Sequence, residues 1–314
     1  MMITDEKLGK ADWASTIAQI QGSILPAVLP RVLVFCGLAT IISGLHASGF
    51  PIYLEKLGDL TTNVIYNLVL GLLVVFRTNT SYDRFWEGRK AWGALVVNIR
   101  NLAQELQVGI ANAASSSEKQ AMIRLLSAFA IATRLHLRNE DMSDELKALI
   151  TPIQAQQLEI SKHRPLVIIF WIRHYLQTQL SLDNINDNQL TAANTMLGSL
   201  VEGITGCERI ITTPIPIAYR VFLKRLILIY CIGLPFRIVP DIAWWSIPMM
   251  AFISFLLLGV EEVGRELENP FGYHANDLPL DDICSAIINN VESTLTLGVQ
   301  FPPEQASPEA LSSA

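Results

Sequence analysis

Residues 68–93 read LVLGLLVVFRTNTSYDRFWEGRKAWG, and this stretch decides the fold. Its first part is as apolar as a membrane-spanning helix, and its second part is polar, basic and aromatic. A helix in a soluble core has no reason to change character so sharply along its axis, whereas a helix that leaves hydrocarbon for cytoplasm does. The stretch therefore predicts one continuous helix that leaves the membrane near Arg77.

The composition of the whole chain favours contact with lipid. Of its 314 residues, 51% are hydrophobic and only 17% are charged, and the mean hydropathy is +0.36. Globular proteins carry charge on about 25% of their residues. The formal net charge of -6 and the lack of a dominant basic face argue against a nucleic-acid partner. The four cysteines form no C-x-x-C pair, so no disulfide framework is expected.

Four segments are expected to span a bilayer, which takes about 20 apolar residues per helix. They are residues 30–52, 60–78, 222–238 and 242–260. The third span is expected to continue a helix that begins in the cytoplasm. Thr212, Thr213 and Pro214 predict its start, because threonine is a common N-cap and proline a common first helical residue.

Basic residues predict the topology. The expected outside loops, residues 51–59 and 237–241, hold only Lys56 and Arg237, whereas residues 77–213 carry most of the lysine and arginine. By the positive-inside rule, both termini and the long middle region are cytoplasmic.

The cytoplasmic part is also expected to be helical. Apolar residues at helical spacing predict helices at 119–138, 165–180 and about 187–211. Residues 261–301 are expected to form a C-terminal cytoplasmic segment, and the tail 302–314 is expected to be disordered. The predicted fold class is all-α, a multi-pass membrane protein with four transmembrane helices that continue into a helical cytoplasmic region at about 79–213.

Sequence patterns of catalytic sites are absent. There is no G-x-x-x-x-G-K-[ST], no H-E-x-x-H and no G-x-S-x-G. The five histidines lack ligand spacing, and His136 and His163, which lie among basic residues, are expected to be solvated. The chain is therefore predicted not to be an enzyme and to hold no firm metal site. It also has no internal repeat, which counts against a carrier built from inverted halves.

Three stretches carry a family resemblance. They are FRTNTSYDRFWEGRKAWG at 76–93, GCERIITTPIPIAYRVFLKR at 206–225 and ELENPFGYHANDLPLD at 266–281. Together they resemble the bestrophins, pentameric ion channels of bacteria, plants and animals, and above all the short bacterial type. The resemblance covers about residues 15–295. It implies that residues 1–314 form one channel domain, assembled as a homopentamer in a lipid bilayer, in a prokaryotic cell membrane or another energised membrane.

The resemblance places a narrow hydrophobic neck at Leu68, Leu72 and Phe76, which we call the neck stripe. Five apolar side chains at one constriction offer water no hydrogen bonds, so the pore can dewet and block ions. The residues alone allow a rival, because Asn63 and Asn67 lie on a nearly opposite face at about 100° per residue. Amides are costly in lipid, which would turn them toward the pore. Their alternative role is hydrogen bonding between helices.

The resemblance implies two further sites. Counting back from Cys207 places the cytosolic aperture at Asn188. The Ca²⁺ clasp of animal members falls on Glu266, Asn269, His274 and Asp277. Because a histidine replaces one carboxylate and Ca²⁺ prefers about six to eight hard oxygens, this clasp is expected to be weakened or lost. The acidic residues Glu261, Glu262, Glu266 and Glu268 are expected to be a solvated helix end, and the alternative is a ring that attracts cations.

The predicted function is a passive channel for small monovalent anions such as chloride or bicarbonate, with no firm cofactor. The charge of a pentamer, 5 × -6 = -30, leans toward cations instead. A channel selective for monovalent cations is therefore the first alternative. A non-conducting membrane scaffold is the second.

Overall fold

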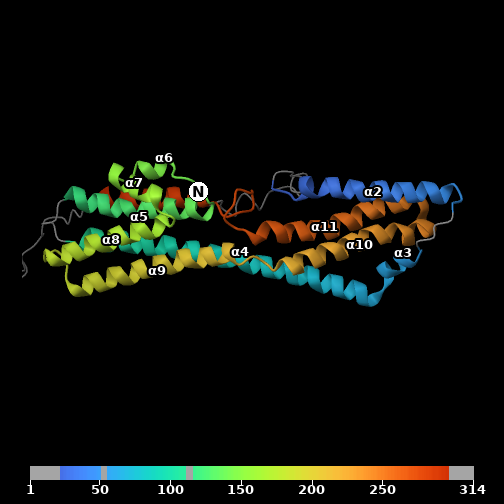
Figure 1. The fold of residues 1–314 in the computed structure, drawn as a ribbon, viewed down its shortest axis with the longest axis horizontal. Coiled ribbons are helices and arrows are strands. Elements are labelled where there is room, and N and C mark those ends of the chain that lie inside the picture. Colours follow the sequence, from blue (N-terminus) through green and yellow to red (C-terminus); the bar gives the residue numbers. More distant parts are fainter. Residues whose placement is uncertain (1–21, 51–54, 111–115, 297–314) are drawn as a thin grey trace, which may run out of the picture. The chain divides into compact units, whose positions relative to one another are not determined.

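The computed structural model describes residues 22–50, 55–110 and 116–296 (Figure 1). These residues form helices joined by short connections, and the described part contains no β-strand. The expected all-α class is therefore confirmed there. The tail 302–314 and the last two residues of the first expected span lie outside the described residues.

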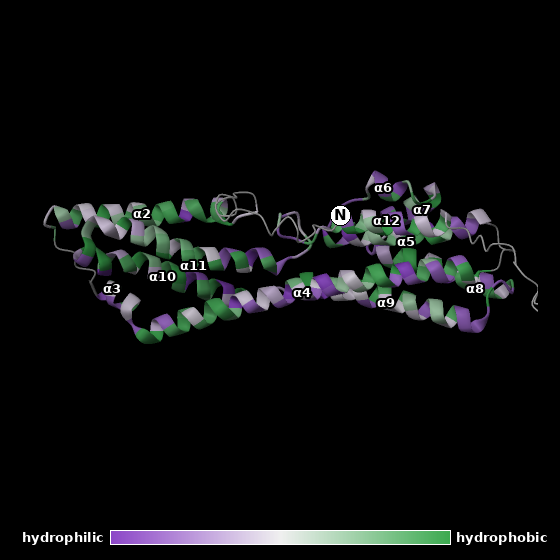
Figure 2. Cartoon of the chain, turned by 180° about the vertical axis from the view of Figure 1, so that it is seen from behind, coloured by the Kyte–Doolittle hydropathy of each residue, from purple (hydrophilic) through white to green (hydrophobic). Residues whose placement is uncertain are grey.

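The chain divides into two compact units. The first comprises residues 1–89 and 209–278, and the second comprises residues 90–208 and 279–314. One helix, α4 (Val64–Gly109), has residues in both units. Figure 2 shows the change in hydropathy along α4, from apolar at its start to polar further on. The continuous helix expected across the apolar-to-polar junction is thus present.

The first unit holds the apolar helices. They are α2 (Leu25–Ala47), α3 (Glu55–Thr62), the start of α4, α10 (Ile217–Ile242) and α11 (Ser246–Glu268). Three described stretches are long and apolar enough to cross a membrane: Leu25–Ala47, Val64–Gly109 and Ile217–Glu268. The third contains both α10 and α11, which are joined by the short helix η1 (Ala243–Trp245). Most of each expected span falls on one helix: α2, α4, α10 and α11 in turn. The second expected span begins within α3, and the fourth also includes the last residue of α10 and η1.

A shared apolar core joins these helices. Its buried members come from all four of them: Phe35, Ala39, Leu70, Leu223, Ile227, Cys231, Leu234 and Met250. Cys231 is a free thiol within this core, and Cys36, Cys207 and Cys284 are also free thiols. Only one face of the apolar part of α4, the face that carries Leu70, packs into this core.

The start of α10 differs from the prediction. Thr212 is the last residue of α9 (Asp187–Thr212), and α10 begins at Ile217 after Pro216. The Thr213 hydroxyl donates to the carbonyl of Arg209, which completes the end of α9 instead of starting α10. The predicted helix start at Thr212, Thr213 and Pro214 is therefore wrong. Pro216, not Pro214, is the residue immediately before α10.

The second unit contains the remaining helices. They are α5 (Ser116–Leu137), α6 (Asp144–Lys147), α7 (Pro152–Ile160), α8 (Arg164–Ser181), α9 and α12 (Leu280–Thr296). The three helices predicted from apolar periodicity match α5, α8 and α9 closely. Helix α5 is buried along most of its length and packs against α8 and α12, so it forms the centre of this unit.

Candidate functional site

The neck stripe lies uncovered on α4. Leu68, Leu72 and Phe76 are 61%, 48% and 58% exposed in the single chain. They are spaced four residues apart, so their side chains follow one face of the helix. A soluble protein would bury such a row, and an uncovered row on an apolar helix must meet lipid, another copy of the chain or a pore.

The opposite face of α4 is held in place. Leu70 is 4% exposed and belongs to the apolar core. The Tyr66 hydroxyl donates to the carbonyl of Leu226 at 2.5 Å, and the Tyr219 hydroxyl donates to the carbonyl of Leu73 at 2.6 Å. Both bonds join α4 to α10. They fix the rotation of α4 about its axis, and hence the direction of the neck stripe.

The rival asparagines have partners within the chain. The Asn63 side-chain oxygen accepts from the Tyr66 amide at 3.1 Å, which caps the start of α4. The Asn67 amide donates to the carbonyl of Thr61 at 2.8 Å. Asn67 also lines a hollow of about 240 Å³ together with Gly71 and residues of α10 and α11. The Asn67 bond joins α4 to α3, as the alternative role requires, whereas the Asn63 bond is a cap within α4. Both side chains are exposed in the single chain, so the choice of the neck stripe as the pore face stays a prediction.

A buried ion pair anchors α4 just below the neck stripe. The Arg77 guanidinium is 2.8 Å from the Glu268 carboxylate, and both residues are buried. The second Glu268 oxygen accepts from the amide of Ile215 at 3.2 Å, and the Glu268 carbonyl accepts from Arg84 at 3.2 Å. Glu268 thus connects the end of α11 with α4 and with the segment that precedes α10.

Arg84 completes this anchor. Its guanidinium donates to the carbonyl of Thr213 at 2.6 Å and to the carbonyl of Ile210. Burial lowers the pKa of Arg84, while the carboxylates of Glu268 and Glu87 oppose that effect. The sequence pointed to this basic stretch, but it contained no sign that Arg77 and Arg84 would share one glutamate nearly two hundred residues away.

The expected solvated helix end is wrong for three of its four glutamates. Glu261, Glu262 and Glu268 are buried, at 5%, 0% and 8% exposure. Each has a basic partner: Lys224 lies 3.6 Å from Glu261, and Arg31 lies 3.1 Å from Glu262, which Arg265 also contacts. A buried carboxylate needs such a partner to offset the cost of leaving water.

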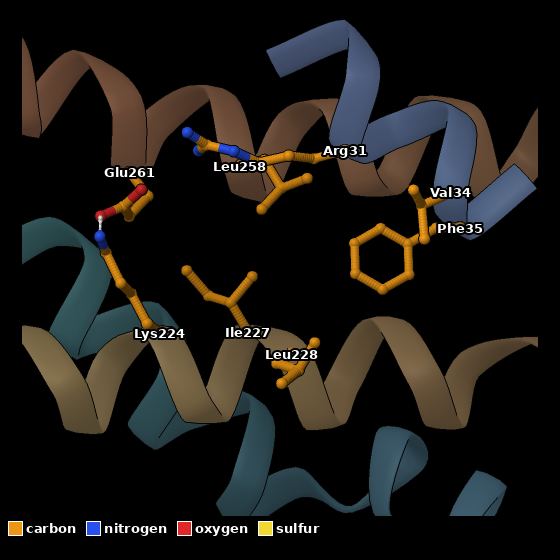
Figure 3. Close-up of a pocket in the computed structure, with 8 residues that line it drawn as sticks. All are labelled: Arg31, Val34, Phe35, Lys224, Ile227, Leu228, Leu258 and Glu261. Atoms are coloured by element: carbon orange, nitrogen blue, oxygen red, sulfur yellow. Dashed lines mark ion pairs between the residues drawn. The ribbon is translucent and has the colours of Figure 1, made fainter. Parts of the chain in front are cut away.

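The Lys224–Glu261 pair closes one end of a hollow between α2, α10 and α11 (Figure 3). The hollow measures about 530 Å³. Its lining residues are Arg31, Val34, Phe35, Lys224, Ile227, Leu228, Leu258 and Glu261. It is thus charged at one end and apolar along the rest of its length.

The expected aperture residue and the expected clasp residues belong to different units. Asn188 is exposed in the first turn of α9, in the second unit. In the first unit, Glu266 accepts from Asn276 at 2.8 Å, and Asp277 accepts from the His274 amide at 2.8 Å. Within the described residues, these side chains do not gather into a group of metal ligands.

Comparison with known proteins identifies the family. The family described as Bacterial/Fungal Bestrophin protein matches residues 2–293. The chain belongs to this bestrophin family. Its relatives include a voltage-dependent anion channel-forming protein of Nostoc, 42% identical over 92% of this chain and 94% of the relative. Another, from Synechocystis, is 41% identical over 93% of each chain.

Solved structures agree with this assignment. A bacterial bestrophin homologue from Klebsiella pneumoniae has a TM-score of 0.77 and 25% sequence identity, and the match covers 86% of this chain and 99% of that one. The resemblance found in the three sequence stretches is thus confirmed across nearly the whole chain. Membership of a family of channels, rather than of enzymes, also agrees with the missing catalytic patterns.

Proposed function

We propose that five copies of this chain form a channel that conducts small monovalent anions, such as chloride or bicarbonate, through a neck made by the neck stripe of each copy. Membership of the bestrophin family and the names of the Nostoc and Synechocystis relatives support an anion channel. The single observation that carries the assignment of the neck is the uncovered row of Leu68, Leu72 and Phe76 on a helix whose other face is locked.

The gating step follows from the chemistry of this row. Fifteen apolar side chains, three from each of five copies, would surround the pore axis without a hydrogen-bond partner for water. A narrow apolar constriction of this kind empties of water and blocks ions, and a small outward movement of the helices refills it. The proposed neck excludes ions by dehydration, so it does not itself select their charge.

The sign of the permeant ion must therefore come from elsewhere on the pathway. The net charge of -6 per chain favours a cation channel as the second candidate. The names of the relatives favour anions. We give the relatives more weight, because the average charge of a chain does not describe the surface that faces the ions.

Cysteine substitution along α4 tests the neck. The background variant is Cys36→Ser, because Cys36 is only partly buried whereas the other three cysteines are buried. Single cysteines at Leu68 and Leu72 should react with a charged, water-soluble thiol reagent and change the current while it is recorded. Matched cysteines at Asn63 and Asn67 should leave the current unchanged. A change in current after modification at the two asparagine positions, with no change at the two leucine positions, would contradict the proposed neck.

A further inference from the structure

Two histidines and a glutamate from distant parts of the chain meet in the second unit. His136 lies in the last turn of α5, His163 immediately precedes α8, and Glu208 lies on α9. The Nε2 atoms of both histidines lie 2.7 Å from the same oxygen, Oε1 of Glu208. The imidazole rings are stacked, with centroids 4.5 Å apart and planes inclined by 28°. The prediction that both histidines are merely solvated is wrong.

This arrangement has the chemistry of a transition-metal site. Two imidazole nitrogens and one carboxylate oxygen are a common ligand set for Zn²⁺ and related ions, and water completes the coordination. It is the only such cluster among the described residues, and its ligand atoms lie within 4.8 Å of one another. We propose that His136, His163 and Glu208 bind one divalent transition-metal ion of the zinc class in each chain.

The distances suit a metal after a small adjustment. Bonds of about 2.0–2.2 Å to a tetrahedral zinc ion separate neighbouring ligand atoms by about 3.3 Å. The two nitrogen-to-oxygen distances of 2.7 Å therefore have to open by less than about 1 Å. Stacked rings that present the same nitrogen to one oxygen already have the side-by-side orientation of two ligands on one ion.

Access and charge also favour a cation. The side chains of His136, His163 and Glu208 are 26%, 30% and 27% exposed, so an ion and its water can reach them. The neighbouring basic residues are engaged elsewhere. Arg138 contacts Asp281, and Arg164 donates to the carbonyl of Glu140.

The backbone leaves the His163 side chain available as a ligand. His163 occupies the N-cap position of α8, yet its side chain makes no capping hydrogen bond. It points to Glu208 instead. A bound ion would therefore join the end of α5, the start of α8 and the last turns of α9. Because the ion binds the folded unit, it would stabilise the second unit by mass action.

Isothermal titration calorimetry on the full-length protein, purified without a histidine tag, tests the proposal. Zn²⁺ should bind with one ion per chain, and Mg²⁺ should not compete, because it prefers oxygen ligands. Each of His136→Ala, His163→Ala and Glu208→Gln should weaken Zn²⁺ binding by more than about 100-fold, which exceeds the effect of changing a residue that only supports a ligand.

The control is His174→Ala. His174 is an exposed histidine on α8 that stacks on Phe170, and it should not matter for Zn²⁺ affinity. A second measurement needs no variant: Co²⁺ added to the native protein should give a visible absorption band that Zn²⁺ abolishes. Absence of stoichiometric Zn²⁺ binding, or equal binding by the three variants and the control, would show a hydrogen-bonded trio without metal affinity and would overturn the proposal.

Discussion

Glu268 is the residue that links α4 to the end of α11 and to the segment before α10. Its carboxylate forms the buried ion pair with Arg77 and accepts a hydrogen bond from the Ile215 amide, and its backbone carbonyl accepts one from Arg84. Removing one member of a buried pair leaves the other charge desolvated, which costs more than the pair itself contributes. The Arg77–Glu268 pair therefore adds an anchor below the neck stripe to the two tyrosine hydrogen bonds that fix the rotation of α4.

Glu268→Gln should destabilise the protein strongly. We expect a loss on the order of 3–5 kcal/mol, because Arg77 would remain buried without a countercharge. The thermal unfolding midpoint of the purified protein measures the effect. The matched control is Asp241→Asn, since Asp241 pairs with Arg237 at an exposed site where a pair contributes less than about 1 kcal/mol. Equal midpoints for the two variants would contradict the role given to Glu268.

Glu292 gives a prediction that depends on pH. Its hydrogen bond with Arg124 lowers the pKa of its carboxyl group, and both side chains are about 40% exposed. A carboxyl group with a lower pKa in the folded than in the unfolded chain stabilises the folded state, and the effect is complete when the pH is above the unfolded-state pKa. The effect disappears as the pH falls through the folded-state pKa. Glu292→Gln should thus lower the free energy of unfolding at pH 7 by less than about 1 kcal/mol, with a correspondingly small fall in the unfolding midpoint.

At low pH, where Glu292 is protonated in both the folded and the unfolded protein, the variant and the native chain should unfold alike. Thermal melts across the acidic range measure this convergence. A difference that stays constant with pH would mean that Glu292 acts through packing and not through its charge.

At the scale of elements, the contact between α3 and α10 is set by two glycines. A Cβ atom at Gly233 of α10 would come within 2.7 Å of the Leu57 carbonyl, and one at Gly58 of α3 within 2.9 Å of the Arg237 amide nitrogen. Each helix therefore uses a glycine where the backbone of the other comes closest. The short helix α3 can lie flat on α10 for this reason.

Gly233→Ala should separate the two helices at a cost of about 1–3 kcal/mol, the usual range for overpacking. The obstacle is a backbone carbonyl, which cannot rotate away as a side chain would. Gly44→Ala on α2 is the control, since nothing lies within 4 Å of its added Cβ and alanine favours helix. A midpoint for Gly233→Ala at or above that of Gly44→Ala would refute the close approach.

The sequence predicted helices well and long-range contacts poorly. Apolar periodicity located α5, α8 and α9, and the change in character after Phe76 predicted the continuous α4. Periodicity reports which face of one helix is apolar. It says nothing about which distant charge will meet Glu262, so buried glutamates were mistaken for a solvated end.

The His136, His163 and Glu208 cluster escaped the sequence for the same reason. Metal patterns are recognised by short spacing, and these residues come from three separate elements. The boundary between α9 and α10 was misplaced by a different cause, because two nearby prolines each suit a helix start. The neck stripe came from family resemblance, since its residue types alone do not distinguish a pore from lipid.

At the scale of the whole molecule, the proposed pore requires an assembly of several chains. One chain has no closed conduit in the proposed scheme, and the neck stripe is completed only by other copies. Native mass spectrometry in detergent should give five times the 34.8 kDa mass of the chain. A monomer or a dimer that nevertheless conducts would contradict the five-fold neck.

The clasp residues bear on how the assembly is controlled. Within one chain, the Glu266 carboxylate accepts from the Asn276 amide and the Asp277 carboxylate accepts from the backbone amide of His274, and a histidine stands where the clasp pattern has a carboxylate. We therefore expect conductance to persist when Ca²⁺ is removed with a chelator. Currents recorded before and after chelation measure this. A steep loss of current at micromolar Ca²⁺ would show that a working clasp forms between copies.

The proposed anion conductance is tested by the reversal potential of the purified protein in a planar lipid bilayer under a potassium chloride gradient. An anion channel predicts a reversal potential close to the equilibrium potential of chloride, and neck variants such as Leu72→Ala should increase the current without changing its sign. A reversal potential close to that of potassium, or no current from the reconstituted protein, would contradict the proposed function.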